Sequence, residues 1–229
     1  MPINAQQQAA QRNLSYLLAE KIAQQLLSGH YKEGSILPGE MELAGIYGVS
    51  RTAVREAVKT LAAKGMVLPR PRIGTRVMQQ TNWNFLDQDL LTWWMNRENS
   101  QEVMQHFLIM RTALEPQACF LAATQATPEQ KHQLSLYMGE MRALDDAFDR
   151  ERWIAVDGQF HQLIYEASAN PFLTSFANLF SSVYHRYFQT ITGNEVIKLH
   201  HHHAIVAAIL ASDSAAAHAA CLALLTDAD

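Results

Sequence analysis

The sequence has little of several features that would define its class at once. Only two cysteines, Cys119 and Cys221, occur in 229 residues, so a disulfide-rich scaffold is excluded, and neither thiol stands in a catalytic motif. The longest apolar runs, such as AIVAAILA, are too short to cross a bilayer. No segment resembles a signal peptide, and we therefore expect a reduced, cytoplasmic protein with no membrane partner. The net charge of −4 gives no overall attraction to nucleic acid, so any DNA-binding surface has to be local.

Apolar residues are plentiful, at 48% of the chain, and their spacing predicts a mainly α-helical protein. The polar start, with QQQAAQ, is expected to form a flexible tail over residues 1–13. Apolar residues then recur at helical spacing over 14–27, and short helices are predicted over 40–47 and 51–64. The stretch GMVLPRPRIGTRV follows, and its prolines, glycines and β-branched residues favour a small hairpin. This order of elements is that of a winged helix-turn-helix.

The rest of the chain is predicted to be all-α, with about six or seven helices. Thr127 and Gln130 form a capping-box pattern with a proline between them, and NPF at residues 170–172 repeats the cap-then-proline device. The expected division is a winged domain over 14–77, a linker over 78–86 and an all-helical bundle over 87–229.

Basic residues cluster in the winged domain, with seven of them and one acidic residue between Arg51 and Arg76. Arg70 and Arg72 flank a proline in the hairpin, so we expect their charges to point outward together. An ordinary solvated basic face is the alternative interpretation.

The start of the helix over 51–64 favours DNA binding over that alternative. Ser50 can cap the helix, which leaves backbone N–H groups and the positive helix end facing outward, as a phosphate site needs. Arg51, Thr52 and Arg55 fall in its first turns, where a recognition helix meets the major groove.

This part of the chain resembles the DNA-binding domain of GntR-type bacterial transcription regulators. The resemblance rests on Gly-x-x-Leu-Pro, Glu-Leu-Ala, Val-Ser-Arg-Thr-x-Val-Arg-Glu-Ala and a Gly-Thr wing tip, which occur in this order. It implies that a palindromic operator is contacted by Arg51, Thr52 and Arg55, with Gly74 at the wing tip. Three positions depart from the pattern: Gly39, Met41 and Ala53. Many members have a DNA-contacting arginine in place of Met41, so the departures bear on which operator is bound.

A candidate metal site begins in VDGQFHQLI, where Asp157 and His161 are four residues apart and project from one helix face. Such a pair can share a cation, although it more often forms only a hydrogen bond within the helix. The helical domain is similar to the FCD ligand-binding domain of FadR-type regulators. Metal-binding members combine Asp-x-x-x-His with a histidine that opens a later helix and with a final histidine. By this pattern HHAIVAAI provides His202, and Leu224 occupies the place of the final histidine.

The resemblance therefore implies three ligands, Asp157, His161 and His202, with open positions for water or a small molecule. Imidazole with carboxylate suits Zn²⁺, Ni²⁺ or Mn²⁺. In the alternative, the same polar residues hydrogen-bond a ligand without metal. The chain ends at LLTDAD, earlier than we expect for the last helix of this family.

Effector contacts are expected on the same domain. Arg111, in IMRTALEP, falls where this branch commonly has an arginine that could clamp a carboxylate. A salt bridge to Glu115, one turn later, is the alternative. His185 and Arg186, in VYHRYF, are further candidates for lining the effector cavity.

The stretch WNFLDQDLLTWW is similar to a sugar-acid-sensing subgroup that includes the galactonate-operon repressor. Its apolar residues also fit the core-facing stripe of a linker helix: Trp83, Phe85, Leu86, Leu90, Leu91 and Trp94. The resemblance implies a homodimeric repressor of a sugar-acid catabolic operon, released by a small carboxylate effector such as galactonate or another hexonate. One alternative is the same regulator type with a dicarboxylate, hydroxy acid or acyl-CoA effector. Another alternative is a metallo-hydrolase fused to a DNA-binding module. The sequence has no HExxH motif and no obvious general base beside the three ligands, which argues against this alternative.

Overall fold

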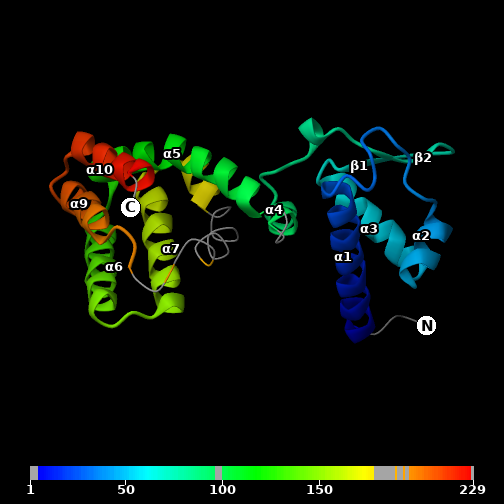
Figure 1. The fold of residues 1–229 in the computed structure, drawn as a ribbon, viewed down its shortest axis with the longest axis horizontal. Coiled ribbons are helices and arrows are strands. Elements are labelled where there is room, and N and C mark those ends of the chain that lie inside the picture. The colour runs from blue at the N-terminus through cyan, green and yellow to red at the C-terminus, as the bar shows by residue number, and fades with distance from the viewer. Residues whose placement is uncertain (1–4, 96–99, 178–188, 190–192, 194–195, 228–229) are drawn as a thin grey trace. The chain divides into compact units, whose positions relative to one another are not determined.

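The structure is a computed structural model that describes residues 5–95, 100–177, 189, 193 and 196–227. The chain divides into two compact units, Met1–Asn96 and Arg97–Asp229 (Figure 1). Over the described residues the protein is mainly helical, with a single two-stranded sheet, which confirms the predicted fold class. No helix in these ranges combines the length and apolar character needed to cross a membrane.

The N-terminal unit is the predicted winged helix-turn-helix. Its elements are α1 (Ala5–Leu27), α2 (Glu40–Tyr47), α3 (Arg51–Ala63), β1 (Val67–Arg70) and β2 (Gly74–Val77). The two strands form an antiparallel hairpin in which Val67 lies opposite Val77. Helix α1 begins at Ala5, within the range 1–13 that is expected to be a flexible tail. Alanine and glutamine are good helix formers, so they extend the helix toward the N-terminus.

The core of this unit lies between α1 and α3, which pack on each other. One face of α3 is buried through Ala53, Val54, Ala57, Val58 and Leu61. It meets the buried face of α1, formed by Leu18, Ala19, Ile22, Ala23 and Leu26. Burial of each valine or leucine contributes about 1.5–3 kcal/mol relative to exposure. This packing leaves the opposite face of α3 in solvent.

A tight turn ends α3. Gly65 has φ +75°, and a Cβ atom there would lie 2.1 Å from the backbone oxygen of Asn82. Only glycine tolerates both the left-handed backbone and this close approach. The turn therefore sets the distance between the end of α3 and η1 (Gln80–Asn82).

Helix α4 (Gln88–Trp94) groups with this unit, whereas the helical domain is expected from the sequence to begin at residue 87. Asp87 caps α4 by accepting a hydrogen bond from the N–H of Leu90 at 3.0 Å. The buried ammonium of Lys64, just after α3, donates to Asp87 at 2.6 Å and to Asp89 at 2.7 Å. These contacts hold α4 against the end of α3.

The apolar stripe predicted over residues 83–94 is only partly correct. Leu90 and Trp93 are buried in the N-terminal core. Leu86 is 56% exposed, and Trp94, which was expected in the stripe, is only half-buried. The cap at the start of α4 and the Lys64 contacts set the rotation of the helix, and they turn Trp93 inward.

The C-terminal unit is all-helical over its described residues. Its helices are α5 (Ser100–Gln125), α6 (Pro128–Asp146), α7 (Arg150–Ala167), α9 (Leu199–Leu210) and α10 (Ser214–Thr226). The predicted capping box is confirmed: Thr127 Oγ1 accepts from the Gln130 N–H at 3.2 Å, and the Thr127 N–H donates to Gln130 Oε1 at 2.9 Å. Residues 171–177 are also helical, and the side chain of Asn170 caps this segment.

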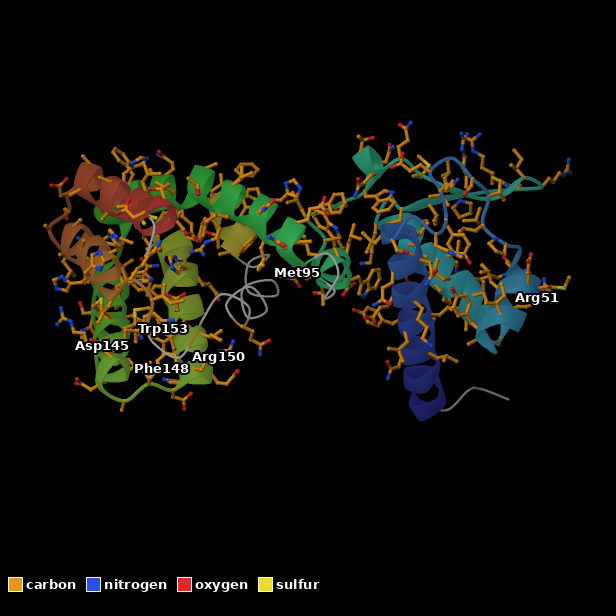
Figure 2. All side chains as sticks on the ribbon, viewed as in Figure 1. Arg51, Met95, Asp145, Phe148, Arg150 and Trp153 are labelled. Atoms are coloured by element: carbon orange, nitrogen blue, oxygen red, sulfur yellow. The ribbon has the colours of Figure 1, made fainter. Side chains whose placement is uncertain are left out.

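Helix α5 packs against α7, α9 and α10, and α6 packs against α7 and α9 (Figure 1). Most of the shared interior is apolar, with Trp153 fully buried on α7 (Figure 2). The exceptions on α5, α7 and α9 are charged or titratable side chains, each at most 3% exposed: Arg111, Glu115, Asp157, His161 and His202. Buried charges are costly unless they are paired or bind an ion, so this group marks a candidate site.

Candidate functional site

The first candidate surface is the N-terminal end of α3. Ser50 caps the helix as predicted, because its Oγ accepts the N–H of Ala53 at 3.2 Å. Arg51, Thr52 and Arg55 are exposed beside this cap, and Figure 2 labels Arg51 at the helix start. The side chains of Arg51 and Arg55 are 58% and 57% exposed. Two cations at the positive end of a helix suit contacts with phosphates and base edges.

The hairpin forms a second exposed basic surface. Arg70 and Arg72 are both exposed, and Arg72 has φ +65° in the turn between the strands. Gly74 pairs with Arg70 across the hairpin and has φ +108°. A Cβ on Gly74 would lie 2.8 Å from Cγ2 of Ile36, so glycine is needed there on two grounds. The tip is thus a compact wing with two cations.

In the C-terminal unit, the structure brings the three predicted metal ligands together. Asp157 and His161 lie one turn apart on α7, and His202 lies near the start of α9. Nε2 of His202 is 2.9 Å from Oδ1 of Asp157, and Nε2 of His161 is 3.8 Å from the same oxygen. One ligand atom from each residue falls within 4.8 Å of the others, and all three residues are buried. No other group of three such residues occurs in the part of the chain that the structure describes.

The orientation of His202 fits a metal ligand. Its Nδ1 lies 3.1 Å from the carbonyl oxygen of Lys198, and since a carbonyl only accepts, Nδ1 is the donor. Nε2 faces Asp157 but is not aligned with a hydrogen-bond partner within the described chain. A histidine whose second ring nitrogen is held by a carbonyl presents the first to an ion. A cation there could bind Nε2 of His202 together with the carboxylate of Asp157.

Arg111 and Glu115 border the three residues. The two form a bidentate pair on α5, with Nε–Oε1 at 3.1 Å and Nη2–Oε2 at 3.0 Å. Both residues also contact His161. Oε2 of Glu115 is 3.5 Å from Nδ1 of His161, and Nη2 of Arg111 is 3.4 Å from Nε2 of His161. The alternative predicted for Arg111, a salt bridge to Glu115, is therefore present, and it lies directly against the metal-ligand candidates.

Burial and charge set the protonation of this group. Burial lowers the pKa of His161 to about 4, although the carboxylate of Glu115 opposes the shift. Burial alone would raise the pKa of Asp157, but the contact with His202 and the nearby His161 and Arg111 outweigh it and lower that pKa. Near neutral pH the site thus offers a carboxylate and a neutral imidazole, the forms that bind metal ions.

The place of a fourth ligand is apolar. Leu224 is buried on α10, and Cys221, one turn earlier, is a buried thiol. His218 is half-buried on the same helix but does not join the group of ligand atoms. The two remaining effector candidates, His185 and Arg186, lie outside the described residues.

Two residues of the site were not predicted as parts of it. The sequence predicts Glu115 only as a partner of Arg111, yet in the structure it also faces His161. The spacing of an arginine and a glutamate at positions i and i+4 of an apolar helix is the sequence pattern that could have indicated this role. Lys198 orients His202 through its carbonyl oxygen, and its Nζ donates to the carbonyl of Leu224 at 3.2 Å. Lys198 has φ +50°, which sequence spacing does not indicate.

Comparison with known proteins agrees with both units. Residues 15–77 match the gntR family of bacterial regulatory proteins, and residues 106–227 match the FCD domain. The HTH-type transcriptional regulator YieP of Escherichia coli is 67% identical over 229 residues, 100% of each chain. The galactonate operon transcriptional repressor of E. coli is 29% identical over 175 residues, 76% of each chain. A solved GntR structure from Streptococcus agalactiae has a TM-score of 0.52 and 25% identity, and the match covers 92% of this chain and 96% of that one.

Proposed function

Since the chain belongs to the gntR family of bacterial regulatory proteins and has an FCD domain, we propose that it represses a sugar-acid catabolic operon and leaves its operator when a hexonate binds. The buried group of Asp157, His161, His202 and Arg111 is the observation that carries this proposal. The family and its relatives are transcription regulators and not enzymes, so the metallo-hydrolase alternative gains no support. With operator DNA as its partner, the protein acts in the cytoplasm.

The donor set suits a divalent ion. Asp157, His161 and His202 would hold Zn²⁺, Ni²⁺ or Mn²⁺, which would supply positive charge and open coordination positions for oxygen ligands. The fit rests on Nε2 of His202, a buried nitrogen that faces a carboxylate without an aligned hydrogen bond. In this structure Nε2 of His161 lies against Arg111, so a ligating His161 would give up that contact.

Charge balance favours an acid with one carboxylate. Asp157 and Glu115 contribute two negative charges and Arg111 one positive charge. With both histidines in the neutral form that a metal ion requires, the buried group has a net charge of −1. A divalent ion would bring this to +1, and a single carboxylate would then neutralise it. A dicarboxylate would leave a buried charge unpaired, which is costly.

The hydrogen-bond donors of the site favour acids with several hydroxyl groups. Arg111 brings a buried guanidinium to the site, where Glu115 holds it beside His161, and its N–H groups donate to the carboxylate and hydroxyl oxygens of an acid. A hexonate offers both the carboxylate and several hydroxyl groups. Similarity to the galactonate operon repressor supports the same class of ligand.

Release of DNA requires that the effector prefers one state of the protein. We expect a homodimer whose two α3 helices bind the half-sites of a palindrome, as helix-turn-helix dimers do. The effector would favour a dimer in which the helices no longer match both half-sites. Its affinity for the two states has to differ for any shift to occur.

Fluorescence anisotropy tests the proposal. The full chain is bound to a duplex from the upstream region of its own gene and titrated with a panel of hexonates, with and without a chelator. The expected result is release by one hexonate, lost after chelation and in His202→Ala. Release that persists after chelation and in His202→Ala would refute the requirement for a metal ion. Tight DNA binding that ignores every hexonate, but responds to a dicarboxylate or a hydroxy acid, would refute the sugar acid.

A further inference from the structure

Glu40, in the first turn of α2, contacts two arginines of α3. Its Oε2 accepts a hydrogen bond from Nε of Arg55 at 2.7 Å and lies 3.8 Å from Nη2 of Arg51. All three side chains are more than 40% exposed, so the contact lies on the surface of the winged domain. A carboxylate in contact with two arginines that are proposed to bind a polyanion is unexpected.

We propose that Glu40 is a positioning residue that sets operator specificity by holding the guanidinium of Arg55 in the orientation that contacts a base pair. The inference rests on the proposed contacts of Arg51 and Arg55 with DNA. It concerns a residue of α2 that need not touch the nucleic acid itself.

The hydrogen-bond geometry supports this role. Glu40 binds Nε of Arg55, which leaves the two terminal nitrogens of the guanidinium available. Those nitrogens form the bidentate contact with O6 and N7 of guanine, the commonest specific arginine–base contact. A side chain held in place before binding loses less conformational freedom when the contact forms.

The energetics exclude stability as the main role of the pair. Ion pairs between exposed side chains contribute little to folding, and these side chains are 41% and 57% exposed. Glu40 is also a favourable residue in the first turn of a helix, but glutamine retains most of the same helix propensity. The principal effect of the carboxylate is therefore expected on DNA binding.

The charge of Glu40 should affect DNA affinity in opposite directions for unrelated and for preferred sequences. A carboxylate near the DNA backbone repels phosphates, so it weakens binding to any sequence. A carboxylate that orients Arg55 strengthens binding only where the matching base is present. Removing Glu40 should therefore raise affinity for unrelated DNA and lower affinity for the preferred sequence.

Glu42 gives a matched control. It lies in the same first turn of α2, is exposed, and forms no ion pair with any residue that the structure describes. Glu42→Gln removes the same charge as Glu40→Gln from nearly the same place. The difference between the two variants isolates the contact with Arg55 from the change in net charge.

The experiment measures the dissociation constants of the full chain for two duplexes at several salt concentrations. One duplex is selected by the wild-type protein from a random-sequence library, and the other is its shuffled sequence. We expect Glu42→Gln to strengthen binding to both duplexes about equally. Glu40→Gln should strengthen binding to the shuffled duplex and weaken binding to the selected one, so that the ratio of affinities falls about tenfold. Thermal unfolding of each variant confirms that it is folded.

Arg55→Ala separates this inference from the proposed function. If Arg55→Ala leaves the selected duplex bound as tightly as before, Arg55 is not a DNA contact and both proposals about this surface fail. If Arg55→Ala loses specific binding while Glu40→Gln behaves like Glu42→Gln, only the role of Glu40 is refuted. In support of the role, Glu40→Gln should cause no further loss of specificity in the Arg55→Ala background.

Discussion

The ammonium group of Lys64 lies 2.6 Å from Oδ1 of Asp87, so one buried cation joins the end of α3 to the cap of α4. The same nitrogen is 2.7 Å from Oδ2 of Asp89 and 5.1 Å from the ring centre of Trp93. Tyr16 on α1 completes the group by donating to Asp89 at 2.9 Å. The helix proposed to bind DNA, α3, and the last described helix of the N-terminal unit, α4, are thus fastened to each other.

Lys64→Met is expected to destabilise the N-terminal unit. The substitution keeps much of the apolar stem but leaves two carboxylates without their cation. Because Asp87 and Asp89 retain 28% and 42% side-chain exposure, water offsets part of the loss. We expect the free energy of unfolding to fall by about 2 kcal/mol, below the range for fully buried pairs. Urea denaturation followed by circular dichroism measures this change.

Lys59→Met is the control for that experiment. Lys59 lies on α3, has a 72% exposed side chain and pairs with Glu56, three residues away. A surface pair of this kind is worth about 0.5 kcal/mol. Equal losses for the two lysine variants would contradict the importance of the Lys64 contacts.

Metal binding is expected to depend on His202 and not on its neighbour. His202→Ala removes a buried ligand, whereas His203→Ala removes an exposed histidine from the same helix turn. Calorimetric titration of chelator-treated protein with ZnCl₂, NiCl₂ or MnCl₂ should show binding that is weakened at least about 100-fold in His202→Ala. His203→Ala should bind as the wild type does. Loss of binding in both variants, or in neither, would speak against the assigned centre.

Acid is expected to destabilise the metal-free protein. Burial lowers the pKa of His161 from 6.5 to about 4. Between these values the unfolded chain binds a proton that the folded chain excludes, so the free energy of unfolding falls as the pH decreases. For one proton the slope reaches about 1.4 kcal/mol per pH unit. The pKa of Asp157 is lowered, so this carboxyl adds a loss in the same direction at still lower pH.

The pH effect is measured by denaturation at pH 6.5 and near pH 5, in wild type and in His161→Gln. Glutamine does not titrate, so the variant should lose the part of the slope that belongs to His161. Identical slopes in the two proteins would show that His161 is not the group responsible.

Two glycines should respond to alanine with opposite signs. Gly65→Ala places a methyl group 2.1 Å from the oxygen of Asn82 at φ +75°, so we expect a loss of about 2 kcal/mol or more. Gly45 lies within α2 and does not have a positive φ. A Cβ atom built there has no described neighbouring atom within 4 Å. Gly45→Ala should stabilise the protein by about 0.5–1 kcal/mol. Thermal unfolding of both variants checks the pair, and a stable Gly65→Ala would disprove the close approach.

Local patterns predicted much of this molecule. Ser50, Thr127 and Asn170 cap helices where the sequence indicated, because capping depends on residues within one turn. The spacing of Asp157 and His161 also placed them on one face of a helix. The family resemblance, and not spacing, supplied His202, which lies far along the chain and meets them only in the folded unit.

The errors arose where packing decides. In a helix as short as α4, periodicity does not determine which of two adjacent tryptophans is buried, and the Lys64 contacts favour Trp93. The grouping of α4 with the N-terminal unit depends on the same Lys64 contacts, so the composition of the sequence did not indicate it. The double role of Glu115 also required knowledge of how α5 faces α7.

The Lys64 contacts have a consequence for building chimeric regulators. The family match ends at residue 77, which suggests a convenient place to exchange effector domains. A cut there would remove Asp87 and Asp89, and a buried ammonium would be left without its carboxylates. It would also remove Asn82, against which the turn at Gly65 packs. The portable module therefore extends through Met95, and recombination partners should be spliced after that residue.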